Sequence, residues 1–348
     1  MRKFQLCIGF FLWIITVCIT AIEKENSQNN NNGDDKIANT GPYYPNPDNL
    51  KGQKPLNPNV FQNPYFIQKS NPKSTTLNNG NSKLFGVVNS DNQCKVQMSL
   101  PPDPTFGCCG QEMSDSTGLA GGKNTKLDQF AWTVLLNIIF SRSREAKIFD
   151  IEITLAEYDK RTFPRDCANI EIGLSKNRKC IDNVLMHAKN IIIHPEYDDD
   201  RLDNDIALIE IDGYAPYTRH IRPICLPSIN LDDPEFSNLP LTAVGWGRNG
   251  IYNTNVKKST IVHLVPHDEC EISYPYLSIA QICAAGHTGE VTCKGDSGGP
   301  LMLQYRTIYY VVGVVSGKRS DSPCGSSVPS LYSNVYYYVP WIRSVIES

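Results

Sequence analysis

Short apolar runs separated by turn residues follow one another from Gly118 to the end of the chain, and no other feature limits its possible folds as strongly. The runs are rich in β-branched and aromatic residues and are bounded by Gly, Pro, Asn and Asp. They cover residues 131–139, 150–155, 190–193, 206–211, 241–245, 259–265 and 307–316. Short strands at such spacing are typical of an all-β barrel or sandwich. We therefore expect an all-β fold for this part of the chain.

The C-terminal segment has a different pattern. Pro340 is suited to the first turn of a helix, because the N–H that proline lacks would have no partner there. Trp341 and Val345 then lie on one face of that helix. A short closing helix beginning at Pro340 is the expected structure.

The N-terminus has the pattern of a secretory leader. Arg2 and Lys3 precede an apolar run over residues 6–19, which is followed by the small residues Thr20 and Ala21. The run is short for a membrane span, so we interpret residues 1–21 as a signal peptide rather than an uncleaved anchor. This interpretation predicts a secreted, extracellular protein.

Residues 22–93 form an arm rich in Asn, Pro, Gly, Ser and Lys, without a sustained period of 2 or 3.6 residues. Its apolar content is too low to offset the entropy of ordering, so we expect this Asn/Pro-rich arm to be disordered. Residues 94–118 then read as a cysteine-containing linker. The formal net charge is −3 and no basic cluster stands out. Nothing in the charge pattern favours binding to nucleic acid or to a membrane.

The chain contains 12 cysteines, and two of them, Cys7 and Cys18, belong to the leader. The other cysteines are Cys94, Cys108, Cys109, Cys167, Cys180, Cys225, Cys270, Cys283, Cys293 and Cys324. An even number in a secreted chain indicates disulfides. No pair has the Cys-x-x-Cys spacing of zinc sites, and Pro266 argues against a helix that would align His263 with His267. We expect neither a metal site nor a cofactor.

Residues 295–300 read Gly-Asp-Ser-Gly-Gly-Pro, a sequence with clear chemical consequences. Its glycines let the backbone N–H groups of Gly295 and Ser297 face one point, where the oxygen of an attacked carbonyl group gains negative charge. A serine nucleophile also needs a histidine to accept its proton and an aspartate to orient the histidine.

Residues 119–348 resemble the chymotrypsin-like serine proteases, a family of two antiparallel β-barrels with the active site between them. Six matching segments occur in the family's order, namely 119–122, 203–208, 245–247, 295–300, 314–316 and 338–342. The resemblance implies that Ser297 is the nucleophile, that Asp205 is the orienting aspartate, and that Gly295 and Ser297 form the oxyanion site. It also implies that Asp296 pairs with the amino group of Leu119 once the zymogen has been cut.

In finer detail the chain is similar to the arthropod clip-domain proteases and their non-catalytic homologues. The segment 155–159, Leu-Ala-Glu-Tyr-Asp, and the two cysteines that follow look like the extra disulfide loop of that group. The resemblance implies the pairs Cys167–Cys180, Cys270–Cys283 and Cys293–Cys324. Cys225 then takes Cys109 or Cys108, and Cys94 takes the other.

The family's histidine has no counterpart in this chain. It belongs between Trp132 and Glu157, in a Thr-Ala-Ala-His-Cys segment, but this interval contains neither His nor Cys. About 20 residues, or two to three strands, are absent, so the first barrel is expected to lack strands. The remaining histidines, His187, His194, His220, His263, His267 and His287, match no triad position.

Other positions also depart from an active trypsin-like protease. Gly118 precedes Leu119, and no Arg or Lys lies between Cys109 and Leu119, so a trypsin-like activator is not expected to cut there. At the specificity pocket, Val291 gives no charge to bind a basic substrate residue. Lys318 and Ser330 align with pocket walls that are usually glycine.

Together these features predict a protease homologue of an extracellular cascade, by resemblance of the immune melanisation type, that binds protein partners without cleaving them. Without the histidine, turnover falls by a factor on the order of 10⁶ in a comparable hydrolase. One alternative is an active serine endopeptidase whose histidine-bearing segment is missing from this sequence. Another is a structural adhesion module, for which the chain carries no dedicated motif.

Overall fold

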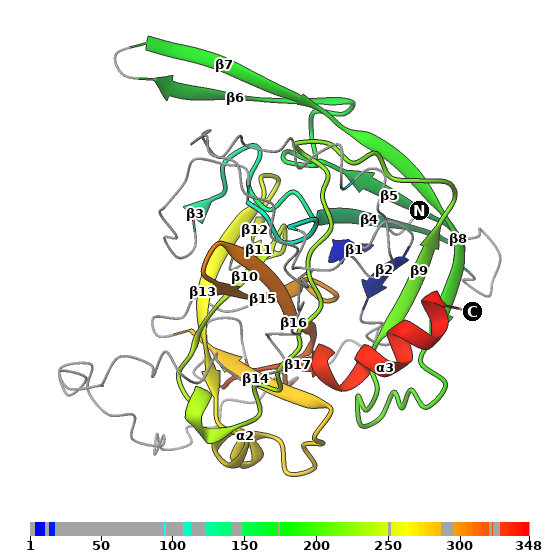
Figure 1. Cartoon of the computed structure of the whole chain (residues 1–348), viewed down its shortest axis with the longest axis vertical. Coiled ribbons are helices and arrows are strands. Elements are labelled where there is room, and N and C mark those ends of the chain that lie inside the picture. Colours follow the sequence, from blue (N-terminus) through cyan, green and yellow to red (C-terminus); the bar gives the residue numbers. More distant parts are fainter. Residues whose placement is uncertain are drawn as a thin grey trace, which may run out of the picture. The chain divides into compact units, whose positions relative to one another are not determined.

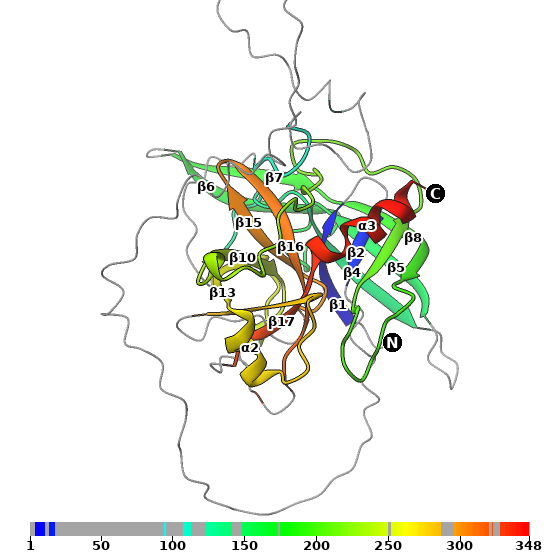
Figure 2. The ribbon, with the colours of Figure 1, turned by 60° about the horizontal axis from the view of Figure 1, so that its bottom comes forward.

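The computed structural model describes residues 4–10, 14–17, 94, 107–112, 123–140, 148–172, 175–249, 252–286, 296–319, 322 and 328–347. These residues form mostly β-structure, as expected from the sequence, and they build two closed sheets (Figures 1 and 2). The predicted arm and the 287–295 segment lie outside the described residues.

The first sheet is a closed barrel with the strand order β1-β2-β9-β8-β5-β4. Four of its strands come from the protease-like part of the chain, namely β4 (Thr133–Phe140), β5 (Ile148–Leu155), β8 (Val184–Ile193) and β9 (Ala207–Ile211). All neighbouring strands are antiparallel. The protease-like part therefore supplies fewer strands than the barrel needs, in agreement with the expected loss.

The missing wall is occupied by the N-terminal segment that the sequence pattern indicates as a leader. β1 (Phe4–Phe10) pairs with β4, and β2 (Ile14–Val17) pairs with β9. These two strands lie between β4 and β9 (Figure 1). Together, β1 and β2 pair with the edges of β4 and β9, which would otherwise be unpaired, and so close the barrel.

The second sheet has the order β10-β15-β16-β17-β14-β13, and the additional pairing of β10 with β13 closes it. Its strands are β10 (Pro240–Gly245), β13 (Lys258–Val265), β14 (Gln281–Ala285), β15 (Pro300–Tyr305), β16 (Ile308–Gly317) and β17 (Ser330–Asn334). β3 (Lys123–Asn124) adds to the outside of β13. The short elements are β11 (Arg248–Asn249), β12 (Tyr252–Asn253), the 3₁₀ turn Pro234–Phe236 and α2 (His267–Ser273).

An aromatic group joins the cores of the two barrels. Trp132, just before β4, is fully buried, and its ring centroid lies 5.2 Å from that of Tyr309 on β16. The indole N–H of Trp132 donates to the sulfur of Met302, on β15, at 3.0 Å. The apolar core is therefore continuous from one sheet to the other, which fixes the barrels against each other.

A two-stranded hairpin of β6 (Arg165–Ile172) and β7 (Ser175–Asp182) extends from the first barrel between β5 and β8 (Figure 1). The disulfide Cys167–Cys180 joins the two strands at directly opposed positions. This is the extra loop implied by the resemblance to clip-domain proteases.

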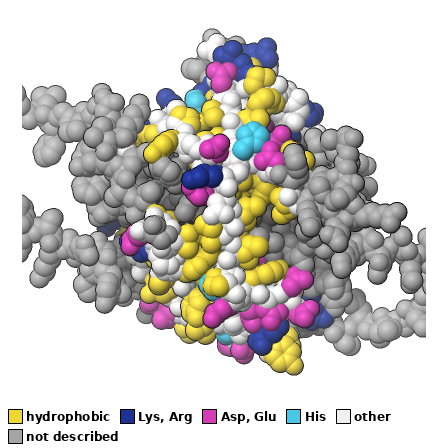
Figure 3. Space-filling model, turned by 90° about the vertical axis from the view of Figure 1, so that its right-hand side faces the viewer, with side chains coloured by type: hydrophobic (Ala, Val, Ile, Leu, Met, Phe, Trp, Pro, Cys, Tyr) yellow, Lys and Arg dark blue, Asp and Glu magenta, His cyan; other side chains and the backbone are white. Residues whose placement is uncertain are grey.

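The closing helix begins earlier than the sequence pattern predicts. α3 covers Val335–Ile346, and Pro340 lies inside it rather than at its start. Val335, Tyr338 and Ile342 are buried in the main core, at the spacing of one helical face. Packing of this face stabilises the helix despite the hydrogen bond that Pro340 cannot donate. On the side of the molecule that bears α3, Tyr336 and Tyr337 are 40% and 48% exposed, and hydrophobic side chains form a band (Figure 3).

The linker before the first barrel is fixed to the second barrel. Cys109 forms a disulfide with Cys225, and Cys94 forms one with Cys108, so the pairing left open by the sequence is decided. The N–H of Gly110 donates to Pro223 at 2.9 Å, and its carbonyl accepts from the N–H of Tyr309 at 2.8 Å. A fourth described disulfide joins Cys270 to Cys283, whereas the proposed Cys293–Cys324 pair lies outside the described residues.

Candidate active site

Asp205 lies just before β9 and is completely buried. The hydroxyl of Ser316 donates to its carboxylate at 2.7 Å, and the hydroxyl of Ser333 donates to its backbone carbonyl at 2.6 Å. Ser316 and Ser333 belong to β16 and β17 of the second barrel. A carboxylate of the first barrel is thus oriented by donors from the second.

The residue before Asp205 adds a further constraint from α3. Asn204 has a backbone φ of 52°, a left-handed conformation that asparagine tolerates better than most residues. Its side-chain amide donates to the carbonyl of Glu196 at 2.9 Å, and its side-chain oxygen accepts from the hydroxyl of Tyr338 at 3.3 Å. These contacts hold the turn that delivers Asp205.

Ser297 lies in a turn immediately before β15 and is partly exposed. Gly298 has a φ of 79°, which glycine adopts without steric cost, and its N–H donates to the carbonyl of Val315 at 2.8 Å. The N–H of Val315 in turn donates to Gly299 at 2.9 Å. The glycines therefore dock the turn of Ser297 on β16.

The end of β16 contacts both the turn that carries Ser297 and the side chain of Asp205. Val315 binds the turn that carries Ser297, and the next residue, Ser316, binds Asp205. The sequence predicted Ser297 and Asp205 as site residues from separate motifs. In the fold, the turn of Ser297 and the side chain of Asp205 hydrogen-bond to consecutive residues of β16.

Asp296 is held by the backbone of the second barrel. Its carboxylate accepts from the N–H of Gly247 at 2.8 Å. A Cβ atom at position 247 would lie 2.2 Å from the Asp296 carboxyl group, so only glycine permits this approach. Leu119, whose amino group was the expected partner of Asp296, lies outside the described residues, so that pairing remains a prediction.

Three described histidines make polar or ring contacts with residues other than Ser297 and Asp205. His187 pairs with Asp150 at 2.8 Å on the exposed side of β8 and β5. His267, in α2, faces Asp232 at 3.3 Å. Two others, His194 and His220, are partly buried, and burial lowers the pKa of both imidazoles. His194 packs against the rings of Tyr338 and Trp341.

His263 belongs to β13, and His287 lies outside the described residues. Among the described residues, no histidine occupies a place on β4 or β5, the strands that flank the position of the family's base.

The predicted specificity pocket is described only in part. Lys318 follows β16 and is partly buried, and burial lowers the pKa of its amine. Ser330 begins β17 and is buried. Val291 and the oxyanion donor Gly295 lie outside the described residues. The pocket assignment therefore remains a prediction.

Sequence reasoning did not assign roles to the residues that support Asp205. Ser316, Asn204 and Tyr338 were recognised only as parts of the matching segments 314–316, 203–208 and 338–342, and Ser333 was not singled out. The motif was a usable signal for Ser316. For Ser333 no local pattern was available, since its contact spans 128 residues of sequence.

Comparison with known proteins identifies the architecture. The family model described as Trypsin matches residues 167–342. The chain belongs to the trypsin family. Among trypsin-family relatives, the "Phenoloxidase-activating enzyme" of Bombyx mori is 31% identical over 298 residues, an alignment covering 73% of this chain and 66% of that protein. The "CLIP domain-containing serine protease B4" of Anopheles gambiae is 33% identical over 278 residues, covering 72% and 75% of the two chains.

A solved structure leads to the same family. The Drosophila Grass clip serine protease of the Toll pathway superposes with a TM-score of 0.55 and 27% sequence identity, covering 69% of this chain and 74% of that one. The Anopheles and Drosophila proteins are named as clip-domain serine proteases, the Bombyx protein is named for phenoloxidase activation, and the Drosophila protein is named for the Toll pathway. The resemblance inferred from the motifs is thereby confirmed.

The described residues contain neither a candidate membrane-spanning helix nor a candidate metal site. Neither helix has the length and apolar character needed to cross a membrane. In the described ranges, no group of three or more His, Cys, Asp or Glu side chains is arranged to hold a metal ion.

Proposed function

We propose that this trypsin-family chain is a secreted protease homologue that acts by binding within an extracellular protease cascade. The observation that carries the proposal is the direct connection of β4 to β5. The two strands pair up to Phe140 and Ile148, and only seven residues, Ser-Arg-Ser-Arg-Glu-Ala-Lys, lie between them. Neither this connection nor the two strands contain a histidine, so the interval from Trp132 to Glu157 lacks the family's base.

The remaining wall of the first barrel does not restore the base. It is formed by β1 and β2, and residues 4–17 contain no histidine. Ser297 and Asp205 thus keep their supports on β16, while β1, β2, β4 and β5 contribute no histidine that could take the proton from Ser297. A serine hydroxyl without a neighbouring base is a weak nucleophile.

Secretion is supported by covalent chemistry as well as by the leader pattern. Four disulfides lie among the described residues, and such bonds persist in oxidising, extracellular environments. A cascade setting is supported by the relatives named for phenoloxidase activation and the Toll pathway. This cascade setting favours protein partners over nucleic acid or membranes as ligands.

The experiment is to incubate the purified secreted protein with a serine-directed fluorophosphonate probe and peptide substrates. The expected result is labelling no greater than that of a Ser297→Ala variant, and no cleavage. Stoichiometric labelling of Ser297 would overturn the proposal.

The retained contact between Ser316 and Asp205 also suits a second candidate, an active serine endopeptidase whose histidine segment is missing from this sequence. With Val291 in the pocket, such an enzyme would favour apolar or small residues before the cut. Sequencing the transcript across the codons for Phe149 to Ile153 distinguishes the two candidates. An inserted Ala-His-Cys segment would establish the second.

A further inference from the structure

The segment between β13 and β14 exposes three large apolar side chains. Ile272 is 79% exposed, Tyr276 82% and Ile279 64%. They lie on α2 and on the loop that leads to β14, at the lower end of the second barrel in Figure 1. Ile272 and Tyr276 are the two most exposed of the large apolar side chains in the described part of the chain. Apolar side chains on a surface are normally scattered singly, whereas a group of them marks an interaction site.

The loop holds these side chains outward on a fixed backbone. A disulfide between Cys270 and Cys283 closes it, and Tyr274 and Leu277 pack inward against that disulfide. The hydroxyl of Tyr274 donates to the carbonyl of Pro329 at 2.8 Å, and the N–H of Leu277 donates to the carbonyl of Tyr274 at 3.0 Å. Because the inward residues already order the loop, a partner that binds its outer side chains meets a preorganised surface.

Acidic side chains share the exposed side of α2 with Ile272. Asp268 and Glu269 lie four and three positions before it, a spacing that places side chains on one helical face. Both acids are exposed. We define the α2 face by its exposed acidic and apolar side chains, Asp268, Glu269, Glu271, Ile272, Tyr276 and Ile279. Apolar groups with a polar margin are the usual construction of a protein interface.

The negative charge of the α2 face continues onto the neighbouring 3₁₀ turn. His267 joins the two segments, since one ring nitrogen faces Asp232 at 3.3 Å and the other faces Glu271 at 3.5 Å. Residues 228–238 and 266–283 each contain three Asp or Glu residues and no Lys or Arg. Neither segment therefore supplies a lysine or arginine to pair with its carboxylates.

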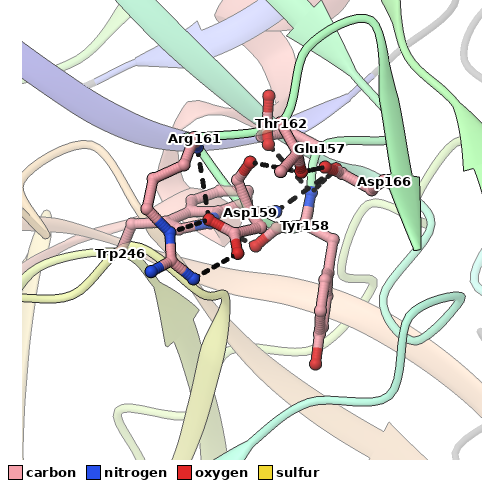
Figure 4. Close-up of polar contacts among 7 residues, drawn as sticks. All are labelled: Glu157, Tyr158, Asp159, Arg161, Thr162, Asp166 and Trp246. Atoms are coloured by element: carbon pink, nitrogen blue, oxygen red, sulfur yellow. Dashed lines mark hydrogen bonds and ion pairs between the residues drawn. The ribbon is translucent and has the colours of Figure 1, made fainter. Parts of the chain in front are cut away.

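The acidic loop after β5 differs in this respect (Figure 4). There Asp159 accepts two hydrogen bonds from the guanidinium group of Arg161, of 2.8 and 2.6 Å, and this pairing lowers the pKa of the Asp159 carboxyl group. That loop brings its own cation, whereas the segments of the α2 face leave room for a cation from outside.

The chemistry of the α2 face selects its occupant. Nucleic acids and anionic lipid surfaces carry negative charge, so the carboxylates repel them. Two α2 faces opposed in a symmetric dimer would bring like charges together, which disfavours a second copy of this chain. A protein segment in which Lys or Arg flanks an apolar side chain matches both the charge and the apolar surface.

We propose that the α2 face binds a protein partner through a basic segment that carries apolar side chains among its Lys or Arg residues. The proposal rests on the function proposed above and adds the chemistry of the partner. The apolar side chains of the segment cover Ile272, Tyr276 and Ile279, and its cations lie against Asp268 and Glu269. Attraction between opposite charges speeds the encounter, and burial of the apolar groups stabilises the complex.

The test measures the fluorescence anisotropy of a labelled peptide, Gly-Arg-Lys-Leu-Tyr-Arg-Lys-Gly, with the purified secreted protein. Two comparison peptides carry Ser in place of Leu and Tyr, or Gln in place of every Arg and Lys. We expect the first peptide to bind at least about tenfold more tightly than either comparison peptide. Its binding should weaken between about 50 and 500 mM salt, because salt screens exposed charges. No binding of the first peptide, or equal binding of all three, would overturn the proposal.

Variants of the apolar side chains locate the binding. Ile272→Ser combined with Tyr276→Ser should weaken binding of the first peptide by about tenfold or more, the effect expected from the loss of an aromatic anchor. Tyr214→Ser, a matched change at another exposed tyrosine, should bind as the wild type does. Unchanged binding in the double variant would place the peptide elsewhere and contradict the proposal.

A charge variant separates the electrostatic contribution. Asp268→Asn combined with Glu269→Gln should weaken binding and reduce its dependence on salt. Asp182→Asn removes an exposed carboxylate on β7 and is the matched control. An unchanged salt dependence in the double variant would show that these two acids do not contact the peptide, and would overturn their assigned role.

Two further measurements do not require a variant to fold. Hydrogen exchange with and without the first peptide should show protection within residues 267–279, and protection confined to other segments would overturn the proposal. In sedimentation, the wild type without peptide should not self-associate through this face; association that the peptide disrupts would assign the face to a second copy instead. Labelling of Ser297 by a fluorophosphonate probe would overturn the proposed function without changing these binding results, so the two failures are distinguishable.

Discussion

The hydroxyl of Ser316 donates a 2.7 Å hydrogen bond to the carboxylate of Asp205, and both side chains are completely buried. This contact joins the second barrel to the first at the candidate site. It is made without any histidine, so Ser316 and Asp205 are joined as a structural element of the two barrels.

Replacing Ser316 by alanine should therefore destabilise the fold. The change removes a donor from a buried carboxylate, and we expect the free energy of unfolding to fall by about 1–3 kcal/mol. Urea denaturation measures the effect. Ser344→Ala removes an exposed hydroxyl that bonds only to the carbonyl of Trp341 in its own helix, and serves as the matched control. Equal losses of unfolding free energy in the two variants would show that the bond between Ser316 and Asp205 stabilises the fold no more than an exposed hydroxyl does.

The raised pKa of Glu157 predicts a specific dependence of stability on pH. Glu157 retains its proton in the folded state up to about pH 7, whereas its ordinary pKa is 4.5. Between these values the folded state binds more protons, so the contribution of Glu157 to stability is present at low pH and is lost as the pH rises.

Thermal unfolding of the wild type and Glu157→Gln across this range measures that contribution. The wild type should lose about 2–3 kcal/mol relative to the variant between about pH 4.5 and about pH 7. Glu152→Gln should follow the wild type. A constant difference between wild type and Glu157→Gln would contradict the predicted titration.

The disulfides should differ in their effect on stability. Cys109 and Cys225 are 116 residues apart in sequence, and Cys167 and Cys180 are 13 apart. In the chain-entropy account, a longer closed loop restricts the unfolded chain more, so removing the first bond should cost about 2 kcal/mol more than removing the second. Paired Cys→Ser variants compared by guanidinium denaturation give the difference, and an equal or reversed order would refute the prediction.

The N-terminal strands give a further prediction about the first barrel. β1 and β2 cover the edges of β4 and β9, so a chain without residues 1–21 should expose both edges. We expect the free energy of unfolding to decrease by about 3 kcal/mol or more, with increased binding of an apolar dye and concentration-dependent association.

A chain shortened within residues 30–60 keeps both strands and is the control for that deletion. N-terminal sequencing of the secreted protein identifies which form occurs. Identical stability of the full and deleted chains would show that residues 4–17 do not contribute to the barrel.

The sequence by itself determined the fold class, and it predicted Ser297 and Asp205 as site residues. Turn-bounded apolar runs indicate short strands wherever they occur, and the glycines around Ser297 mark a tight turn. These are local signals, which depend on neighbouring residues and can be interpreted without the fold. The absence of the histidine was equally visible, because no residue between Trp132 and Glu157 is a histidine.

Tertiary structure alone decided which distant groups meet. Cys94, Cys108 and Cys109 offered two pairings, and only their positions beside the second barrel select Cys109–Cys225. The start of α3 at Val335 depends on a buried face that outweighs the local preference of Pro340. The raised pKa of Glu157 depends chiefly on burial, and burial is a property of the packed chain rather than of any segment.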